Sequence, residues 1–427
     1  MKLRAYPRYR DSGIEWLGEI PEHWEVKKLK YLARIQTGNT PPRSDPNNYD
    51  ENGIPWIKPD DLGNFIPVSS SSECLSPQGA KLGRLIPQDA VLVCCIGSVG
   101  KMGIAGCTLA TNQQINAVVF NHQELKPKYG RYIMFAASEE HTRLSNTNVV
   151  SILSGEVQKN ILLPDPPIPE QRAIAAFLDR ETARIDTLIE KKERQIELLQ
   201  EKRAALISHA VTKGLNPNVK MKDSGIEWLG KIPEHWEVIR LKFAAQIVMG
   251  QSPDSNDYLY DSVGLPFLQG NAEFSQKHPV PRLICNTAAK VAPAGALLIS
   301  VRAPVGALNI ADREYGIGRG LCAVIPRPIV LDQRYSWYLL QVIRKGLFSA
   351  AKGSTYDAVT ADEVAGLRGV IPPPHEQRAI ATFLDRETAR IDLLIEKIRK
   401  SMDLLREYRT ALISAAVTGK IDVRGIV

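Results

Sequence analysis

The sequence predicts a mixed α+β protein in which two similar globular domains are joined by two long helices that pair antiparallel with each other. Three observations lead to this fold class. The 427-residue chain contains two copies of one sequence unit, each copy has short apolar runs bounded by Gly and Pro, and each copy ends in a heptad-patterned stretch. A duplicated unit of this kind is expected to fold as two related halves about a pseudo-two-fold axis.

The repeat is strongest at the two ends of each copy. Residues 11–35 recur at 223–247 with 19 of 25 positions identical, and residues 170–191 recur at 376–397 with 20 of 22 identical. Identity this high fixes the alignment at both ends, so the divergence between them belongs to the globular domains themselves.

The middle of each copy keeps only a skeleton of turns and strands. The runs 53–57 and 264–268 both begin at a glycine and contain a proline, as strands that follow turns do. The polar loops differ, because Thr-Asn-Gln-Gln at 111–114 aligns with Gly-Ile-Gly-Arg at 316–319. One scaffold is therefore expected to present two different polar surfaces.

Each copy ends in a stretch without Gly or Pro in which apolar residues alternate at spacings of three and four. Over about four heptads this pattern predicts a coiled-coil seam. The first helix leads away from the first globular domain and the second must return, so we expect an antiparallel pair that brings the C-terminus near the N-terminus. The predicted seam consists of Leu178, Ile185, Ile189, Ile196, Leu199 and Leu206, and of Leu384, Ile391, Ile395, Ile398, Met402, Leu405 and Leu412. The predicted division is 1–168 for the first repeat and its globular domain, 169–213 for the first long helix, 214–374 for the second repeat and its domain, and 375–427 for the second long helix and tail.

Composition excludes several classes of protein and leaves nucleic acid open as a partner. The formal charge is +7, from 54 Lys and Arg against 47 Asp and Glu, which suits a polyanion but also an ordinary surface. The six cysteines form no C-x-x-C pair and no histidine stands at zinc spacing, so neither a metal finger nor a disulfide framework is indicated. Without a signal-peptide core or a membrane-spanning run, a cytoplasmic location and no membrane partner are expected.

Two duplicated motifs carry a family resemblance. DSGIEWLGxIPEHWEV precedes each variable segment and PxxEQRAIAxFLDRETARID follows it. In duplicate and at matched spacing, they closely resemble the specificity subunits of type I restriction-modification systems over essentially the whole chain.

The resemblance implies that the variable segments are target recognition domains, each reading one half of a bipartite double-stranded DNA target. It also implies that the helices set the spacer and dock two modification (methyltransferase) subunits, with restriction (motor and nuclease) subunits in the full complex. S-adenosylmethionine, and ATP and Mg for restriction, are then expected on those partners. The chain itself is expected to be non-catalytic and to hold no cofactor or metal.

The sequence agrees with the implied lack of catalysis. Residues 165–167, Asp-Pro-Pro, approach a methyltransferase motif, but Ile168 replaces the aromatic residue and a strand-to-helix connector is the simpler interpretation. Residues 97–101 approach a phosphate loop, but Met102 stands where Ser or Thr would hold magnesium. We expect a turn between strands there.

Base contacts are expected from polar and basic residues in the divergent loops. Arg reaches guanine edges in the major groove, and Asn or Gln reaches adenine. The candidates are Asn39, Arg43, Lys58, Asp60, Gln113 and Gln114 in the first domain, and Gln251, Gln269, Asn271, Arg302 and Arg319 in the second.

The shared motifs have two interpretations that the sequence leaves open. The repeated His-Trp pairs at 23–24 and 235–236 are expected to be packing anchors, with a functional site as the alternative. The repeated Glu-Gln-Arg triplet either caps its own helix or contacts a partner. The candidate partner-docking residues are Glu170, Gln171, Arg172, Glu376, Gln377 and Arg378.

Two other functions are weighed against DNA specificity. A stand-alone DNA methyltransferase or nuclease would need catalytic motifs, which the sequence lacks. A coiled-coil scaffold that binds only protein would leave the divergence of the loops unexplained.

Overall fold

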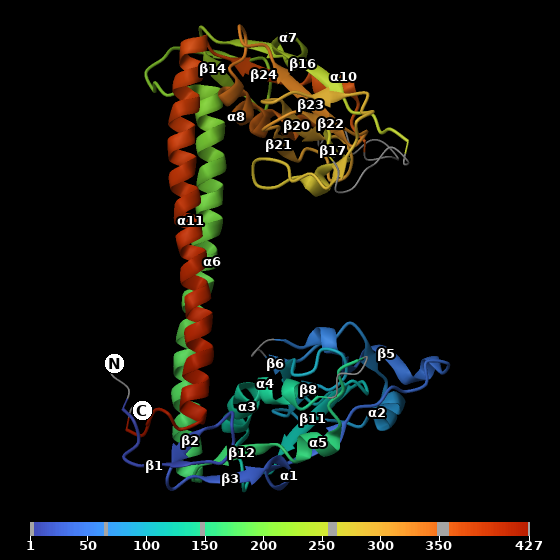
Figure 1. Cartoon of the computed structure of the whole chain (residues 1–427), viewed down its shortest axis with the longest axis vertical. Helices are drawn as coiled ribbons and strands as arrows, with labels where there is room; N and C mark the ends of the chain where they lie inside the picture. Colours follow the sequence, from blue (N-terminus) through green and yellow to red (C-terminus); the bar gives the residue numbers. More distant parts are fainter. Residues whose placement is uncertain (1–3, 64–66, 146–149, 255–262, 348–357, 426–427) are drawn as a thin grey trace. The chain divides into compact units, whose positions relative to one another are not determined.

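The computed structural model describes residues 4–63, 67–145, 150–254, 263–347 and 358–425 and divides into two compact units (Figure 1). Unit 1 comprises residues 1–192 and 399–427, and unit 2 comprises residues 193–398. Each unit therefore contains the globular part of one sequence repeat together with part of both long helices.

Unit 1 is built on a five-stranded sheet in the order β4-β11-β8-β9-β6, beside a three-stranded sheet β10-β5-β7 and the pairs β1-β2 and β12-β3. The central strand β11 reads Ile-Asn-Ala-Val-Val-Phe with five of six residues buried, because strands pair on both of its edges. The strands are β1 Tyr9–Asp11, β2 Glu19–Pro21, β3 Glu25–Lys28, β4 Ala33–Thr37, β5 Tyr49–Ile57, β6 Pro67–Val68, β7 Cys74–Leu75, β8 Val91–Cys94, β9 Met102–Ala105, β10 Ala110–Thr111, β11 Ile115–Phe120 and β12 Leu162–Asp165. The helices are α1 Leu29–Leu32, α2 Pro77–Gly83, α3 Pro127–Ala136, α4 Ser138–Arg143, α5 Gly155–Lys159 and the long α6 Ile168–Lys213, with 3-10 turns η1 Pro46–Asn48 and η2 Pro59–Asp61.

Unit 2 repeats this plan, with a four-stranded sheet β16-β23-β20-β21, a four-stranded sheet β18-β17-β22-β19 and the pairs β13-β14 and β15-β24. The strands are β13 Met221–Asp223, β14 Lys231–Pro233, β15 Glu237–Arg240, β16 Ala245–Met249, β17 Pro266–Leu268, β18 Leu283–Ile284, β19 Val291–Ala292, β20 Leu297–Ser300, β21 Leu308–Ile310, β22 Tyr315–Ile317, β23 Leu321–Pro326 and β24 Arg368–Ile371. The helices are α7 Leu241–Ala244, α8 Gln333–Ile343, α10 Ala361–Gly366 and the long α11 Pro374–Val417, with the 3-10 turn η4 Asn271–Glu273. The predicted mixed fold with two similar domains is confirmed.

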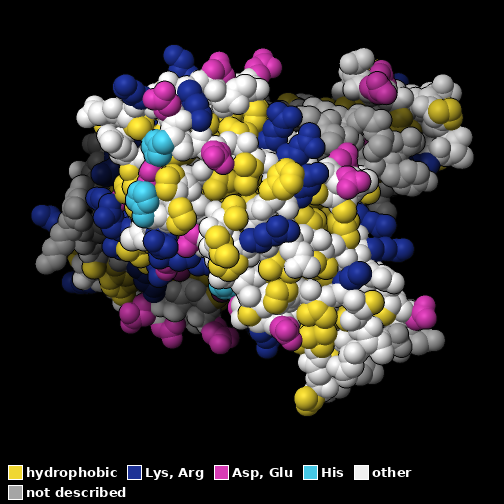
Figure 2. Space-filling model, turned by 90° about the horizontal axis from the view of Figure 1, so that it is seen from above, with side chains coloured by type: hydrophobic (Ala, Val, Ile, Leu, Met, Phe, Trp, Pro, Cys, Tyr) yellow, Lys and Arg dark blue, Asp and Glu magenta, His cyan; other side chains and the backbone are white. Residues whose placement is uncertain are grey.

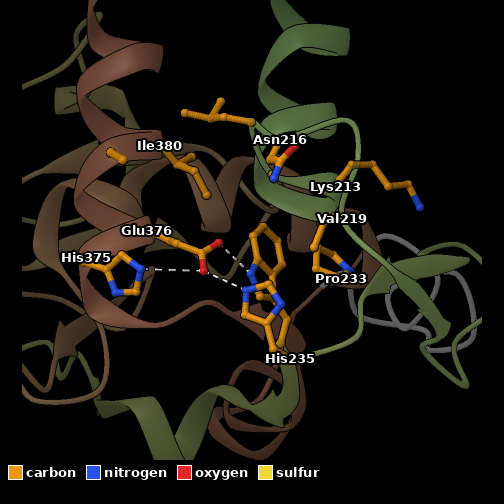
Figure 3. Close-up of a pocket in the computed structure, with 12 residues that line it drawn as sticks. Lys213, Asn216, Val219, Pro233, His235, His375, Glu376 and Ile380 are labelled. Carbon is orange, nitrogen blue, oxygen red and sulfur yellow. Dashed lines mark hydrogen bonds and ion pairs between the residues drawn. The ribbon is translucent and has the colours of Figure 1, made fainter.

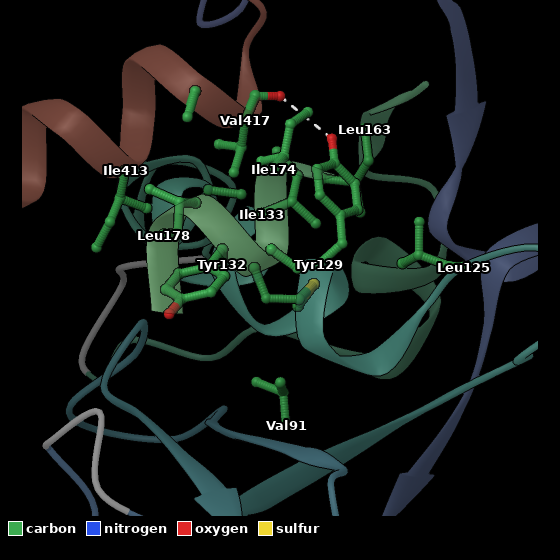
Figure 4. Packing of buried hydrophobic residues seen from close by; sticks show 14 of the residues in the cluster. Val91, Leu125, Tyr129, Tyr132, Ile133, Leu163, Ile174, Leu178, Ile413 and Val417 are labelled. Carbon is green, nitrogen blue, oxygen red and sulfur yellow. Dashed lines mark hydrogen bonds between the residues drawn. The ribbon is translucent and has the colours of Figure 1, made fainter. Parts of the chain in front are cut away.

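A buried tyrosine ties each globular core to the end of a long helix. In unit 1, Tyr129 on α3 lies in the core and donates its hydroxyl to the Val417 carbonyl at the end of α11, at 3.2 Å (Figure 4). In unit 2, Tyr335 on α8 donates to the Val211 carbonyl near the end of α6, at 3.3 Å. Burial raises the pKa of both phenols, so both remain neutral hydrogen-bond donors.

The long helices run antiparallel in each unit (Figure 1). In unit 1 the first half of α6 meets the second half of α11, where Arg409 binds Asp186 at 3.0 Å. In unit 2 the second half of α6 meets the first half of α11, where Arg203 binds Asp392 at 3.0 Å. The two ion pairs are equivalent, because Asp186 corresponds to Asp392 in the repeat and Arg203 corresponds to Arg409. The predicted antiparallel direction of the helices is confirmed within each unit.

The predicted seam residues face inward along both helices. Their apolar side chains leave water and pack between the helices or against a globular core, which is the main source of stability for helices of this length. Buried are Leu178, Ile185, Leu384, Ile391, Ile395, Ile398, Met402 and Leu412, and half-buried are Ile189, Ile196, Leu199, Leu206 and Leu405. Ile207 and Ile413, which the heptad pattern omits, are also buried. Among the helices of the described residues, none is long and apolar enough to cross a membrane.

The two ends of the chain meet in unit 1. The Asp422 amide donates to the Arg4 carbonyl at 2.7 Å, and the Tyr9 hydroxyl donates to the Gly419 carbonyl at 3.0 Å. In unit 2 the continuous segment 214–223 stands at the corresponding place. The predicted closeness of the two termini is confirmed.

Candidate nucleic-acid interface

The candidate loops of unit 1 meet at one edge of its sheets. The Asn39 amide donates to the Thr111 carbonyl at 2.9 Å, and the Asn112 amide donates to the Ile57 carbonyl at 3.1 Å. The Thr40 hydroxyl donates to the side-chain oxygen of Gln113. The structure therefore brings Asn39, Lys58, Gln113 and Gln114 together, although residues 39 and 113 lie far apart in the chain.

Some of these candidates also hold the loops in place. The Asn39 side chain donates to the Leu82 carbonyl at 3.0 Å, and Gln114 accepts from the Asn112 side chain at 2.9 Å. Gln113 and Asp60 are exposed. The backbone of Lys58 is capped by Asp61 and not by Asp60, which leaves Asp60 facing solvent.

A charged cluster that the sequence did not indicate lies beside these loops. Glu73 accepts from Lys58 and binds Arg43 at 3.0 Å. The ammonium of Lys58 and the guanidinium of Arg43 lie 5.2 and 5.7 Å from the centre of the Trp56 ring. The hydrogen bond from Lys58 is the main cause of the lowered pKa of Glu73. Two cations are thus held beside the candidate loops, with one carboxylate bound to both.

The candidate loops of unit 2 meet in the same way. The Gln251 amide donates to the Ile317 carbonyl at 2.9 Å, and the Arg319 amide donates to the Ser252 hydroxyl at 3.3 Å. Gln269 follows β17, whose last residue is bonded to this same loop. The side chains of Gln251, Gln269, Arg302 and Arg319 are exposed, and Asn271 is half-buried at the start of η4.

Backbone contacts show how the two sets of loops correspond. Gly38 and Gly250 pass so close to the facing loop that an added Cβ would lie 2.2 Å from the Asn112 carbonyl or 2.1 Å from the Gly318 carbonyl. Only glycine fits there. The pairing of Asn112 with Gly318 makes 111–114 equivalent to 317–320, so the sequence alignment of that loop with 316–319 was wrong by one residue. Gln113 and Arg319 consequently occupy one position of the shared scaffold.

The repeated His-Trp pairs each bind the glutamate that opens a long helix. Glu170 accepts from His23 at 2.7 Å and from the buried Trp24 indole at 3.0 Å. In unit 2, Glu376 accepts from His235 at 2.6 Å and from the Trp236 indole at 3.0 Å. Both indoles are packing anchors, and both histidines orient a carboxylate.

The other residues of the triplets differ in exposure. Gln171 is buried, accepts from the Lys126 amide at 2.9 Å and donates to the Pro166 carbonyl at 3.0 Å. Gln377 makes the same contacts with Asp332 and Pro372. Arg172 and Arg378 are exposed. A protein partner at these turns would therefore meet the arginines, because the glutamines are enclosed.

Known proteins share this duplicated organisation. The type I restriction modification DNA specificity domain matches residues 21–198 and 233–401, one match in each repeat. The chain belongs to this specificity-domain family. It is 32% identical over 423 residues to the type I restriction enzyme MjaX specificity subunit of Methanocaldococcus jannaschii, covering 96% of each chain. It is 25% identical over 454 residues to the MjaIX specificity subunit of the same organism, covering 99% of this chain and 98% of the other.

Solved structures of low sequence identity share the fold of this specificity protein. A chain from a structure of complex assembly and conformational transition in the type I R-M system gives a TM-score of 0.74 at 23% identity, covering 96% of this chain and 99% of that one. The HsdS subunit from Thermoanaerobacter tengcongensis gives a TM-score of 0.53 at 22% identity, covering 94% and 98%.

The two motifs that approached catalytic patterns have structural roles in this specificity protein. Residues 165–167 lead from β12 directly into α6. Residues 97–101 form the turn between β8 and β9, and the Lys101 ammonium donates to the Pro59 carbonyl at 2.7 Å. Within the described ranges, no group of three or more His, Cys, Asp or Glu side chains is arranged to hold a metal ion.

On the face shown in Figure 2, the described Lys and Arg side chains are interspersed with apolar and acidic ones. The candidate loops are assigned from their shared position and their divergence in sequence.

Proposed function

We propose that this chain is the non-catalytic DNA sequence-specificity subunit of a type I restriction-modification complex. Its two domains, residues 1–168 and 214–374, each read one half of a bipartite target. The observation that carries this proposal is that equivalent positions of one scaffold hold different polar side chains. An example is Gln113 in unit 1 and Arg319 in unit 2, each next to the loop that a glycine contacts closely in both units. A scaffold that keeps its backbone and changes its polar tips is suited to read two different sequences.

The helices are proposed to serve both half-sites at once. As a continuous pair, 169–213 and 375–417 would set the length of the spacer between the half-sites, in the way that dimer geometry sets half-site spacing in simpler regulators. Two modification subunits would dock beside the helix starts, where Arg172 and Arg378 are exposed. Those subunits would bind S-adenosylmethionine and flip the target adenines, and restriction subunits would supply the ATP- and Mg-dependent steps.

A domain exchange tests the proposal. Residues 38–160 are replaced by the equivalent segment of a relative with a different target, and the chimera is expressed with its modification subunit. Methylome sequencing should show one changed half-site, with the other half-site and the spacer unchanged because unit 2 and the helices are unaltered. A change in both half-sites would contradict modular reading. The purified chain alone should transfer no labelled methyl group from S-adenosylmethionine to DNA, and transfer would overturn the non-catalytic assignment.

A further inference from the structure

The equivalent glutamates of the two units differ in what surrounds them. In unit 1, the Tyr6 hydroxyl donates to Glu170 at 3.1 Å, and the Tyr6 ring packs edge-on against Trp24 with centroids 5.6 Å apart. The Arg424 guanidinium lies over the Tyr6 ring, 4.8 Å from its centroid, and binds Glu170 at 3.5 Å. The two ends of the chain thus fill one aromatic and acidic site.

In unit 2 the corresponding residues are different. Tyr6 stands five residues before the first repeated motif, and Asn218 stands five residues before the second. Gly214 approaches Trp236 as Gly419 approaches Trp24, both at 3.1 Å from an added Cβ. Counted from these glycines, the counterpart of Arg424 is Val219. The two aligned positions of unit 2 therefore hold an asparagine and a valine in place of the tyrosine and the arginine.

A pocket of about 240 Å³ lies at this place in unit 2 (Figure 3). Its apolar walls include Trp236, Pro233 and Val219, and Glu376 lies at its base. The Glu376 side chain is 30% exposed and the Glu170 side chain only 10%, whereas His235 and His23 are both 44% exposed. The greater exposure of Glu376 agrees with the absence of a counterpart to Tyr6 and Arg424 on its carboxylate among the described residues.

The rim of the pocket differs as well. His375 lies across the carboxylate from His235, with its Nε2 3.9 Å from Glu376, as Figure 3 shows. Its counterpart in unit 1 is Pro169. Unit 2 thus has an acidic, aromatic-walled pocket at the start of α11, open where unit 1 is closed by its own chain.

We propose that this pocket receives a segment of a partner polypeptide that presents a tyrosine together with an arginine, placed as Tyr6 and Arg424 are in unit 1. The tyrosine hydroxyl donates to Glu376, its ring packs on Trp236, and the guanidinium completes the charge pairing. The proposed function enters only in identifying the partner, which within that complex is a modification subunit. The recognition chemistry itself requires no DNA.

The probe for this site is present in the chain. A synthetic peptide with the sequence of residues 4–11, RAYPRYRD, carries Tyr6 and has arginines on both sides of it that can take the place of Arg424. Titrated into the full chain by calorimetry, it should bind one site with a Kd on the order of 0.1–1 mM, because a short peptide loses its freedom on binding. A peptide with Phe in place of the first Tyr should bind severalfold more weakly.

Three variants locate the binding. Glu376→Gln should weaken peptide binding at least about fivefold, since it removes the charge that receives the arginine. Ala379→Trp, at an exposed helical position on the pocket wall, should block binding without altering the bonds of Glu376. Ala204→Trp makes the same change at an exposed helical position outside the pocket and should leave binding unchanged.

A fourth variant tests the correspondence between the units. Tyr6→Ala combined with Arg424→Ala should open the unit 1 site and raise the stoichiometry from one peptide to two. Absence of binding to the unaltered chain at 5 mM peptide, or binding that Glu376→Gln and Ala379→Trp leave unchanged, overturns the proposal. Concentration-dependent self-association that Ala379→Trp abolishes would identify the occupant as a second copy of this chain and would also overturn it. DNA reading tested by the domain exchange can succeed or fail independently of all these results.

Discussion

The two repeats are most alike where each glutamate anchors its helix and least alike where each domain presents its loops. Each glutamate binds the His-Trp pair of its own repeat, but Glu170 also accepts a hydrogen bond from Tyr6 and pairs with Arg424, which come from the two ends of the chain. At the opposite extreme, Lys58 belongs to a charged cluster, whereas the equivalent Gln269 is a neutral exposed side chain. One duplicated scaffold has therefore diverged at two kinds of surface, which we propose serve a protein partner and DNA respectively.

The largest predicted difference concerns the two glutamates. Glu170→Ala should destabilise unit 1 by about 3 kcal/mol, because it leaves the buried Trp24 indole and the Tyr6 phenol without their shared acceptor, while Arg424 keeps its pairing with Asp422 at 2.8 Å. Glu376→Ala should destabilise unit 2 by only about 1–2 kcal/mol, because water reaches the donors that it releases. Hydrogen exchange of peptides from each unit separates the two effects, since a chain of two units is not expected to unfold in one step.

Exposed Glu190→Ala is the control and should change the free energy of unfolding by less than about 0.5 kcal/mol. Equal losses from the two glutamate variants would show that the chain ends add nothing to the unit 1 site.

The second prediction concerns the charged cluster of Glu73, Lys58 and Arg43 beside the candidate loops of unit 1. Glu73→Gln should release Lys58 and Arg43 and raise nonspecific DNA affinity about tenfold at low salt, with a salt slope steeper by up to about 2 because two more phosphate contacts form. Discrimination at the first half-site should fall, and discrimination at the second should not. Filter binding across salt concentrations measures both.

Glu51→Gln is the matched control, since it removes the same charge from the exposed end of β5 without releasing a cation. An equal gain in affinity from both variants would attribute the effect to net charge. The lowered pKa of Glu73 means that its carboxylate stays ionised below the ordinary glutamate range. The unaltered protein should therefore show no such gain as the pH falls from about 7 to about 5.

The helices and the duplicated fold were predictable because their signals can be read directly from the sequence. A heptad pattern lies within one stretch of sequence, and glycines such as Gly38 and Gly250 mark equivalent turns. The role of Glu170 could not be derived in the same way. Its partners Tyr6 and Arg424 lie at opposite ends of the chain, and no local pattern links them to a residue in the middle.

Individual loop residues were equally hard to assign. Glu73 holds two of the candidate cations, yet in the sequence it is one acid in a polar stretch. The one-residue error at 111–114 has a similar origin. The offset between the repeats changes inside the domain, where too few residues are identical to place the gap, and only the close approach at Gly38 and Gly250 fixes it.

The smallest predicted difference lies inside the cores. His141 in unit 1 is buried, its Nδ1 lies 2.7 Å from the Ala137 carbonyl, and its Nε2 has no hydrogen-bond partner among the described residues. The equivalent residue of unit 2 is the buried Leu347. Burial lowers the pKa of His141 in the folded state. Above about pH 7.5 the imidazole is neutral in both the folded and the unfolded chain, and as the pH falls through about 6.5 the unfolded chain binds a proton that the folded chain excludes.

Unit 1 should therefore lose up to about 1 kcal/mol between about pH 7 and pH 5.5, and His141→Leu should remove that dependence. Leu347→His should introduce the same dependence into unit 2, and the exposed His122→Leu should affect neither unit. Hydrogen exchange at the two pH values measures the effect in each unit. If His141→Leu leaves the loss in unit 1 unchanged, the pH dependence belongs to other groups, and the two cores do not differ in the way that this substitution indicates.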